Sequence, residues 1–334
     1  MILPVNLGPD SYDIVLERGV LARAGEKLNL DRKVLIVTDE GVPEQYAQAL
    51  AAQAKAAHIR RVPQGEGSKS FTVLEELLTQ MLRAGFTRSD CVAAVGGGMA
   101  GDLAGFAAAC YMRGIDFYNI PTTVLSQVDS SIGGKTAVNR GGVKNVVGAF
   151  YQPKKVLIDP DTLATLPPRQ ISSGLAEAVK MALTGDAALF ELFEHEDPQT
   201  HMERIIADAI RIKRSVVEQD EKEQGLRRVL NFGHTIGHGI ESATGLCHGE
   251  CVALGMLPMC SDAVRARLLP VLEKLGLPTS VKADPEKVYE AMLHDKKAGA
   301  GTLTVIRVET PGSFVIEKTA PEALRPLIET VVAR

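Results

Sequence analysis

The sequence has 334 residues, more than one hydrophobic core usually spans, so we expect two domains. The net charge of -4 excludes the strongly basic surface of a nucleic-acid-binding protein, and no apolar stretch approaches the roughly 20 residues of a membrane-spanning helix. The five cysteines are scattered and odd in number, and the first residues show no basic segment followed by a long apolar run. We therefore expect a cytoplasmic protein without nucleic-acid or membrane partners.

Short apolar segments alternate with helical patterns over the first 160 residues. The expected buried strands are Val34–Val37, Cys91–Val95, Phe117–Ile120 and Val156–Ile158. A helix is predicted between the first two, capped by Ser70, with one apolar face formed by Val73, Leu77, Leu78 and Met81. Strands that alternate with helices predict a Rossmann-like α/β domain with a mainly parallel sheet.

The pattern changes after Pro167 and Pro168. Helical periodicity dominates residues 171–184, 200–218, 228–243 and 249–265, and residues 302–308 are predicted to form a short strand. We therefore predict an α/β domain over residues 1–168 and a mainly helical domain over residues 169–334. A cleft between two such domains is a usual place for a ligand.

A glycine-rich turn, GGGMAGD, runs from Gly96 to Asp102 between an expected strand and an expected helix over Leu103–Cys110. Its glycines fit the pattern G-x-G-x-x-G, which lets backbone amides and a helix N-terminus approach a pyrophosphate. The alternative is a turn that merely packs tightly.

The ribose-binding acid that usually follows this turn by about 20 residues is absent. Pro121 and Thr122 stand there instead. An acid does follow an earlier strand, at Asp39, which suits a dinucleotide domain that is wound differently.

Histidines and one carboxylate indicate a metal site. His234 and His238 are four residues apart, on one helical face, and His248 follows at the start of the next expected helix. With Glu177 from a separate helix, two or three imidazoles make a zinc or cobalt site that leaves a position open for substrate. Thr235 stands where a metalloprotease of the H-E-x-x-H type needs its general base.

Two alternatives compete with this interpretation. Cys247 and Cys251 could form a thiolate site with His248. Glu177 and Lys180 could be an ordinary exposed pair at i,i+3.

Basic residues cluster beside glycines and in the helical half. In an acidic protein this grouping favours capture of an anionic small molecule, although any single lysine is usually solvated surface. The residues are Arg113, Lys135, Lys144, Lys180, Lys213, Arg227, Lys296 and Lys297.

Together these segments resemble the 3-dehydroquinate synthase family of sugar-phosphate cyclases. The matching strings are GGGMAGDLAGFAAACYMRGIDF, IPTTVLSQVDSSIGGKTAVN, KNVVGAF, GLAEAVK, LRRVLNFGHTIGHGIE and HGECVALGM. They follow the family's order and spacing from about residue 63 to residue 256, with a weaker echo at residues 294–301.

The resemblance implies a lyase that converts 3-deoxy-D-arabino-heptulosonate 7-phosphate to 3-dehydroquinate and phosphate, the second step of the shikimate pathway. It implies transient oxidation by NAD, phosphate elimination, re-reduction and an intramolecular aldol closure. It also implies that residues 1–168 bind NAD and that residues 169–334 bind the metal and the substrate.

The resemblance also assigns site residues. A divalent zinc or cobalt ion would be held by Glu177, His234 and His248, which moves His238 to the phosphate and proton-transfer side. NAD would contact Asp39, Glu66, Lys69, Gly97, Gly98, Met99, Asp102, Thr122, Thr123, Leu125, Thr165 and Leu166. The catalytic residues would be Asp129, Lys135, Asn145, Lys180 and His238. The substrate would be bound by Arg113, Lys144, Lys213, Arg227, Asn231, Lys296 and Lys297.

Arg113 would reach the phosphate site of a neighbouring subunit, which implies a functional homodimer. Gln170 departs from the family pattern, because an acid near NAD is frequent at its position.

Three other functions remain in view. An inosose or valiolone cyclase is disfavoured by Lys213, Arg227 and Asn231, a set that suits a carboxylate substrate. A metal-dependent polyol dehydrogenase would accumulate NADH, and a ligand-binding or scaffold protein would not need an intact metal site.

Overall fold

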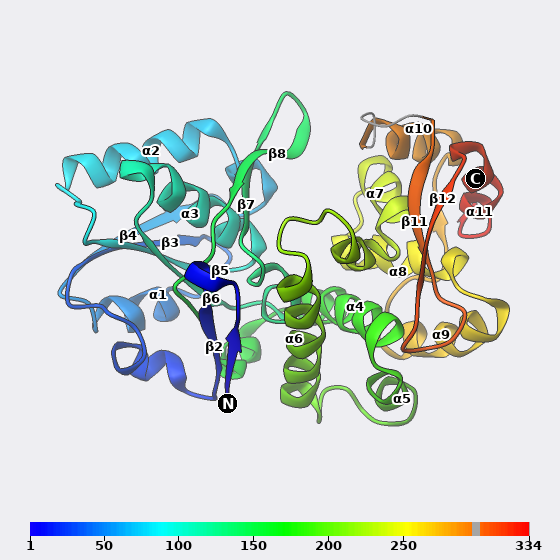
Figure 1. The fold of residues 1–334 in the computed structure, drawn as a ribbon, viewed down its shortest axis with the longest axis horizontal. Coiled ribbons are helices and arrows are strands. Elements are labelled where there is room, and N and C mark those ends of the chain that lie inside the picture. The colour runs from blue at the N-terminus through cyan, green and yellow to red at the C-terminus, as the bar shows by residue number, and fades with distance from the viewer. Residues whose placement is uncertain (296–300, 334) are drawn as a thin grey trace. The chain divides into compact units, whose positions relative to one another are not determined.

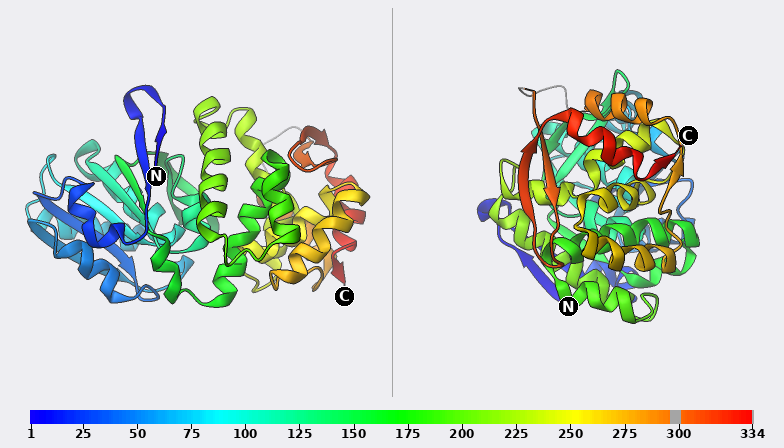
Figure 2. Two further views of the ribbon diagram at one scale, coloured as in Figure 1. Left: turned by 90° about the horizontal axis from the view of Figure 1, so that it is seen from below. Right: turned by 90° about the vertical axis from the view of Figure 1, so that its right-hand side faces the viewer.

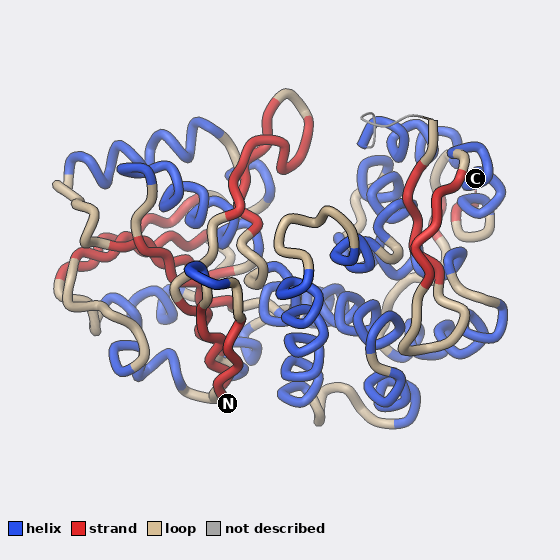
Figure 3. The backbone as a smooth tube through the Cα atoms, viewed as in Figure 1, coloured by secondary structure: helices blue, strands red, loops and turns tan. Residues whose placement is uncertain are grey.

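The computed structural model describes residues 1–295 and 301–333. The chain forms two compact units, Met1–Leu166 and Pro167–Arg334, which are coloured from blue to green and from green to red (Figure 1). Strands gather in the first unit, whereas helices dominate the second (Figure 3). The expected residues Lys296 and Lys297 lie outside the described residues.

A single large sheet organises the first unit, all of whose residues are described. Its seven strands follow the order β1-β2-β9-β6-β5-β3-β4, and every neighbouring pair is parallel except β1 and β2. Their bounds are β1 Ile2–Val5, β2 Tyr12–Leu16, β3 Lys33–Asp39, β4 Ala56–Val62, β5 Cys91–Gly96, β6 Asp116–Pro121 and β9 Lys155–Ile158. The four strands expected from the sequence are confirmed as the cores of β3, β5, β6 and β9.

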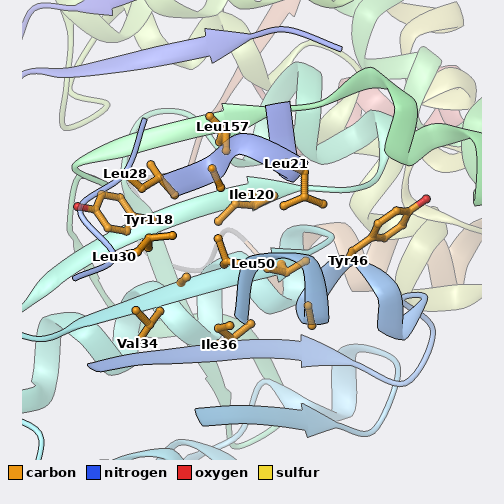
Figure 4. Close-up of a cluster of buried hydrophobic side chains, with 14 of the residues drawn as sticks. Leu21, Leu28, Leu30, Val34, Ile36, Tyr46, Leu50, Tyr118, Ile120 and Leu157 are labelled. Carbon is orange, nitrogen blue, oxygen red and sulfur yellow. The ribbon is translucent and has the colours of Figure 1, made fainter. Parts of the chain in front are cut away.

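Strands β3, β5, β6 and β9 are mainly apolar because both faces of the sheet are covered there. Successive side chains of β3 point to opposite faces, so Val34 and Ile36 join one buried cluster while Leu35 and Val37 join another. Helix α1 (Glu44–Ala51) closes the first cluster with Tyr46 and Leu50 (Figure 4).

Helices α2 (Phe71–Arg83) and α3 (Gly98–Cys110) cover the opposite face. The cap of α2 is confirmed, because the Ser70 hydroxyl accepts a hydrogen bond from the Val73 amide at 3.3 Å. The expected apolar face is partly wrong. Leu74, Leu77 and Met81 are the buried side chains of α2, while Val73 and Leu78 pack at the margin of the cluster.

The strand order reverses direction between β3 and β5. From β3 the chain passes to β4 on one side and then returns to β5 on the other, so the segments that leave β3 and β5 diverge. Open α/β sheets bind ligands at such a switch point, beyond the carboxyl ends of the strands. Asp39 ends β3 and Gly96 ends β5, so the acid and the glycine turn both stand at this point.

A β-hairpin leaves the sheet after β6. Strands β7 (Lys135–Arg140) and β8 (Val143–Phe150) pair antiparallel through Gly141 and Gly142. Both glycines have positive φ, 60° and 79°, as a two-residue hairpin turn requires. Lys135, Lys144 and Asn145 are carried by this hairpin.

The second unit is mainly helical, with two small sheets among its described residues. Its helices are α4 Pro168–Gly185, α5 Ala187–His195, α6 Met202–Gln219, α7 His234–Ala243, α8 His248–Met256, α9 Asp262–Lys274, α10 Pro285–Asp295 and α11 Arg325–Glu329. The strand expected at residues 302–308 is confirmed as β11 (Leu303–Arg307), which forms a long ribbon with β12 (Val315–Thr319) (Figure 2). Strands β10 (Val281–Lys282) and β13 (Val332–Ala333) form the other sheet. None of the helices in the described ranges is long and apolar enough to cross a membrane.

Two helices that the sequence predicts as continuous are interrupted. Residues 228–243 divide into a short 3-10 turn, Leu226–Asn231, and α7, with Gly233 at φ +76° between them. Residues 249–265 divide at Cys260 into α8, a short turn and α9. The first interruption bears on the expected metal site, because it makes His234 the first residue of α7.

Candidate functional site

Three helices of the second unit bring Glu177, His234 and His248 together. Glu177 lies in α4, His234 opens α7 and His248 opens α8, and α8 packs against both other helices (Figure 1). The Nε2 atoms of His234 and His248 lie 3.6 Å and 3.5 Å from Oε1 of Glu177. One ligand atom from each residue falls within 4.8 Å of the others, which is the spacing of a metal site.

Close helix packing makes this approach possible. A Cβ atom on Gly249, in the first turn of α8, would stand 1.8 Å from the carbonyl oxygen of Ser173 in α4. A Cβ atom on Gly255 would stand 1.9 Å from the carbonyl oxygen of Gly233, which precedes α7. Only glycine fits at either position, so α8 lies close to both helices.

Hydrogen bonds fix the orientation of both imidazoles. The Nδ1 atom of His234 lies 3.1 Å from the carbonyl oxygen of Phe232, and Nδ1 of His248 lies 3.0 Å from Oε2 of Glu241. Because a carbonyl and a carboxylate only accept, Nδ1 carries the proton in each ring. The Nε2 lone pairs are therefore left for a cation.

The surroundings of the Glu177 carboxylate favour a positive charge beside it. Glu177 is fully buried, and neither of its oxygens accepts a hydrogen bond from a described residue, although Lys180 Nζ forms an ion pair with it. Burial alone would raise the pKa of Glu177, but Lys180, His234 and His248 hold that pKa well below its usual range. The alternative of an exposed Glu177–Lys180 pair is wrong, since both side chains are buried.

The two histidines respond differently to these surroundings. Burial lowers the pKa of His234 well below its usual value, with Glu177 opposing, so this imidazole is neutral. Burial acts in the same direction on His248, but Glu177 and Glu241 outweigh it and raise its pKa to about 10. A bound cation would therefore displace the His248 proton. A buried carboxylate without hydrogen bonds and two oriented imidazoles fit a zinc or cobalt ion.

The alternative thiolate site is not supported. Burial raises the pKa of Cys251 to about 12, and Cys247 caps α8 together with Glu250. Neither cysteine belongs to the metal-binding groups found among the described residues.

In the first unit, the glycine turn opens directly into α3. The helix begins at Gly98, not at Leu103 as the sequence predicts. A Cβ atom on Gly98 would lie 2.8 Å from Oγ of Ser130, and one on Gly97 would lie 3.2 Å from Thr123. The turn is thus a bare backbone at the N-terminus of a helix, which suits the pyrophosphate of a dinucleotide.

Four expected residues form one polar network beside this turn. Lys69 is buried, and its Nζ lies 2.6 Å from Oδ2 of Asp102 and 3.5 Å from Oε1 of Glu66. It also contacts the side-chain oxygen of Asn145. Asn139, which the sequence analysis missed, donates to Glu66 at 2.9 Å and accepts from the Asn145 amide at 2.8 Å.

The comparisons with known proteins agree with these features. The model of the 3-dehydroquinate synthase N-terminal domain matches residues 59–173, and that of the C-terminal domain matches residues 174–298. A 3-dehydroquinate synthase from Enterococcus faecalis is 43% identical over 352 residues, covering 98% of each chain. The chain belongs to the 3-dehydroquinate synthase family.

Solved structures of related cyclases share the fold. A 2-deoxy-scyllo-inosose synthase complexed with carbaglucose-6-phosphate, NAD+ and Co2+ has a TM-score of 0.88 at 26% identity, covering 98% of this chain and 99% of that one. A 2-epi-5-epi-valiolone synthase from Streptomyces hygroscopicus with NAD+ and Zn2+ bound has a TM-score of 0.84 at 28% identity, covering 96% and 95%.

The remaining residues expected for this family are placed as follows in the second unit. His238 stands beside the metal group, with its ring 5.2 Å from that of His234 and 6.0 Å from that of His248. Lys213 is buried in α6, and Arg227 is buried in the turn before α7, where its backbone amide donates to Asp220 at 2.9 Å. Asn231 ends that turn and donates to Glu223 at 2.7 Å. The turn packs against both α4 and α6.

Other expected residues belong to the first unit. Asp39 is buried, and burial raises the pKa of its carboxyl against hydrogen bonds from the Gly41 and Val42 amides. The Thr122 amide donates to the Gly96 carbonyl oxygen at 2.9 Å, and Thr165 shares a hydrogen bond of 2.9 Å with Tyr46. Met99 lies in α3, Leu125 precedes a π-helical turn that contains Asp129, and Leu166 ends the unit.

Glu241 is a residue of the site that the sequence analysis missed. It groups with His238 and His248 as a second set of potential metal ligands. Its position, three residues after His238 in the same helix, was the available signal, because residues at i and i+3 share a helical face.

Proposed function

We propose that this chain is a carbon–oxygen lyase that converts 3-deoxy-D-arabino-heptulosonate 7-phosphate into 3-dehydroquinate and phosphate. This reaction is the second step of the shikimate pathway of aromatic amino-acid biosynthesis. The observation that carries the proposal is the buried group of Glu177, His234 and His248, in a chain that matches both domains of the family.

Two cofactors supply chemistry that amino-acid side chains lack. A zinc or cobalt ion held by Glu177, His234 and His248 supplies Lewis acidity, which makes sugar hydroxyls more acidic. NAD supplies a hydride acceptor that returns its hydride, so the overall reaction has no net redox change. We assign NAD to the first unit, and the metal and the substrate carboxylate to the second.

The NAD assignment is supported by the glycine turn at the switch point of the sheet. The amides at the start of α3 face the place where a pyrophosphate would lie, and Asp39 ends the adjacent strand. Thr38 Oγ1 and Ser130 Oγ, both near this edge, are buried without a hydrogen-bond partner among the described residues.

Lys213, Arg227 and Asn231 are assigned to the substrate carboxylate. The two cations are buried on elements that pack together, and burial strengthens their attraction for an anion. Fixed cations would orient the sugar acid while its ring opens and closes. This set favours a carboxylate substrate over the carboxylate-free substrate of an inosose or valiolone cyclase.

His238 is assigned to the phosphate and to proton transfer, because α7 holds it beside the metal ligands without making it a member of the Glu177 group. Lys135, Lys144 and Asn145 are assigned to the phosphate, with Lys296 and Lys297 expected on sequence grounds. Asp129 and Lys180 are assigned catalytic roles, and the Lys180 ammonium also balances the charge of Glu177.

A homodimer is proposed because Arg113 is exposed in a strained turn. Met112 and Arg113 have positive φ values of 49° and 69°, a conformation that non-glycine residues adopt only where the surroundings impose it. Such strain is frequent at functional positions, and we assign Arg113 to the phosphate site of a neighbouring subunit.

A cytoplasmic location is proposed because all five cysteines are free thiols.

The test is a phosphate-release assay with 3-deoxy-D-arabino-heptulosonate 7-phosphate, with and without NAD and a chelator. We expect phosphate release that needs both cofactors, with no steady accumulation of NADH. Accumulation of NADH would indicate a polyol dehydrogenase. Turnover of a carboxylate-free heptulose or hexose phosphate alone would indicate a sister cyclase.

A further inference from the structure

Glu241 is a carboxylate that lies next to the metal group but on its far side. It projects from α7, one turn after His238, and its Oε2 lies 3.0 Å from Nδ1 of His248. The other nitrogen of that ring, Nε2, lies 3.5 Å from Oε1 of Glu177. The His248 imidazole is therefore held between two carboxylates that contact its opposite edges.

We propose that Glu241 is the positioning residue for His248 as a metal ligand, an inference that rests on the proposed function. Its carboxylate fixes the proton on Nδ1, so the Nε2 lone pair points toward Glu177 and His234. A carboxylate behind a metal-binding histidine also makes the imidazole a stronger donor and fixes the rotation of the ring.

A comparison of the two histidines explains why His248 needs this support. His234 is anchored by the backbone carbonyl of Phe232, and its side chain is 12% exposed. The His248 side chain is 29% exposed, and its Nδ1 contacts the Glu241 carboxylate instead of a backbone carbonyl. Glu241 supplies from the neighbouring helix what the backbone supplies to His234.

Direct coordination by Glu241 is the competing interpretation, since His238, Glu241 and His248 could themselves hold an ion. The geometry disfavours it for the ion that Glu177 binds. Glu241 contacts Nδ1 whereas Glu177 faces Nε2, and one ion cannot bind both nitrogens of a single ring. Glu241 and Glu177 therefore serve the same histidine in different ways.

The experiment measures zinc and cobalt dissociation constants of the full chain by competition with a chelator, together with the absorption spectrum of the cobalt-loaded protein. Glu241→Ala should weaken metal binding by roughly 10- to 100-fold and should change the cobalt spectrum. Glu241→Gln should weaken it less, because an amide oxygen accepts the same hydrogen bond without the charge. Glu177→Ala, which removes a ligand, provides the reference for a larger loss.

Glu290→Gln is the matched control, because it removes an exposed carboxylate from α10, the helix that packs on α7. It should leave the affinity and the spectrum unchanged. Wild-type affinity and an unchanged spectrum in both Glu241 variants would overturn the proposal. So would a loss in Glu241→Gln as large as that in Glu177→Ala, which would make Glu241 a ligand. A wild-type chain that binds no metal would instead overturn the proposed function.

Discussion

Replacing Gly249 with alanine should open the proposed metal site without replacing any of its three expected ligands. The new Cβ atom would lie 1.8 Å from the carbonyl oxygen of Ser173, whereas an ordinary contact needs about 3.5 Å. The obstacle is backbone, so α8 has to move away from α4 by more than ~1 Å. Glu177 and His248 belong to these two helices, and metal–ligand bonds of about 2.0–2.2 Å do not tolerate such a shift.

The consequence can be measured as a loss of the stabilisation that zinc binding gives to the folded protein. A ligand at about 1,000 times its dissociation constant stabilises a protein by about 4 kcal/mol. We expect zinc to raise the melting temperature of the wild-type chain and to have little effect on Gly249→Ala. Overpacking should also destabilise the metal-free variant by about 1–3 kcal/mol.

Gly245→Ala provides the control for this experiment. Gly245 lies four residues earlier, and a Cβ atom there would meet nothing within 4 Å. This variant should bind zinc and melt like the wild type. If Gly249→Ala also bound zinc with wild-type affinity, the close approach of α4 and α8 would not be what assembles the site.

Three further changes test other parts of the chain. Lys180→Met should destabilise the metal-free protein by about 3–5 kcal/mol, because it removes the Lys180 partner from the buried Glu177 charge, and denaturant unfolding with and without zinc checks this. Lys213→Ala should raise the KM for substrate while the NAD dissociation constant stays near normal, and a collapse of NAD binding would refute the placement of Lys213. Lys69→Met should weaken NAD binding by removing the cation shared by Asp102 and Glu66, with zinc affinity unchanged as the internal control in calorimetric titrations.

Much of the first unit could be predicted because its signals are local. A parallel strand that is buried on both faces reads as a continuous apolar run, which is why β3, β5, β6 and β9 were found. The N-terminus of α2 was found because Ser70 caps it through a contact three residues away. The start of α3 was missed because glycine has a low helix propensity, and Ser130, against which Gly98 packs, comes from a later segment.

Two features of the second unit were not predicted because no local sequence pattern marks them. Strand β12 lacks a buried face, with Val315 and Ile316 exposed, so it shows no alternation of apolar residues. The break before α7 at Gly233 lies against α8, which begins 15 residues later in the chain. Nothing in the spacing of residues 228–243 could reveal a contact with that helix.

The proposed metal ligands illustrate the limit most clearly. Helical spacing alone pairs His234 with His238, because both project from one face of one helix. In the structure, Nε2 of His234 instead shares Oε1 of Glu177 with Nε2 of His248, which comes from α8. His234 can share Glu177 with His248 because α8 approaches its neighbours closely at Gly249 and Gly255, where there is no room for a side chain. Spacing along a helix therefore identifies candidate ligands, but close packing between helices decides which of them can share an ion.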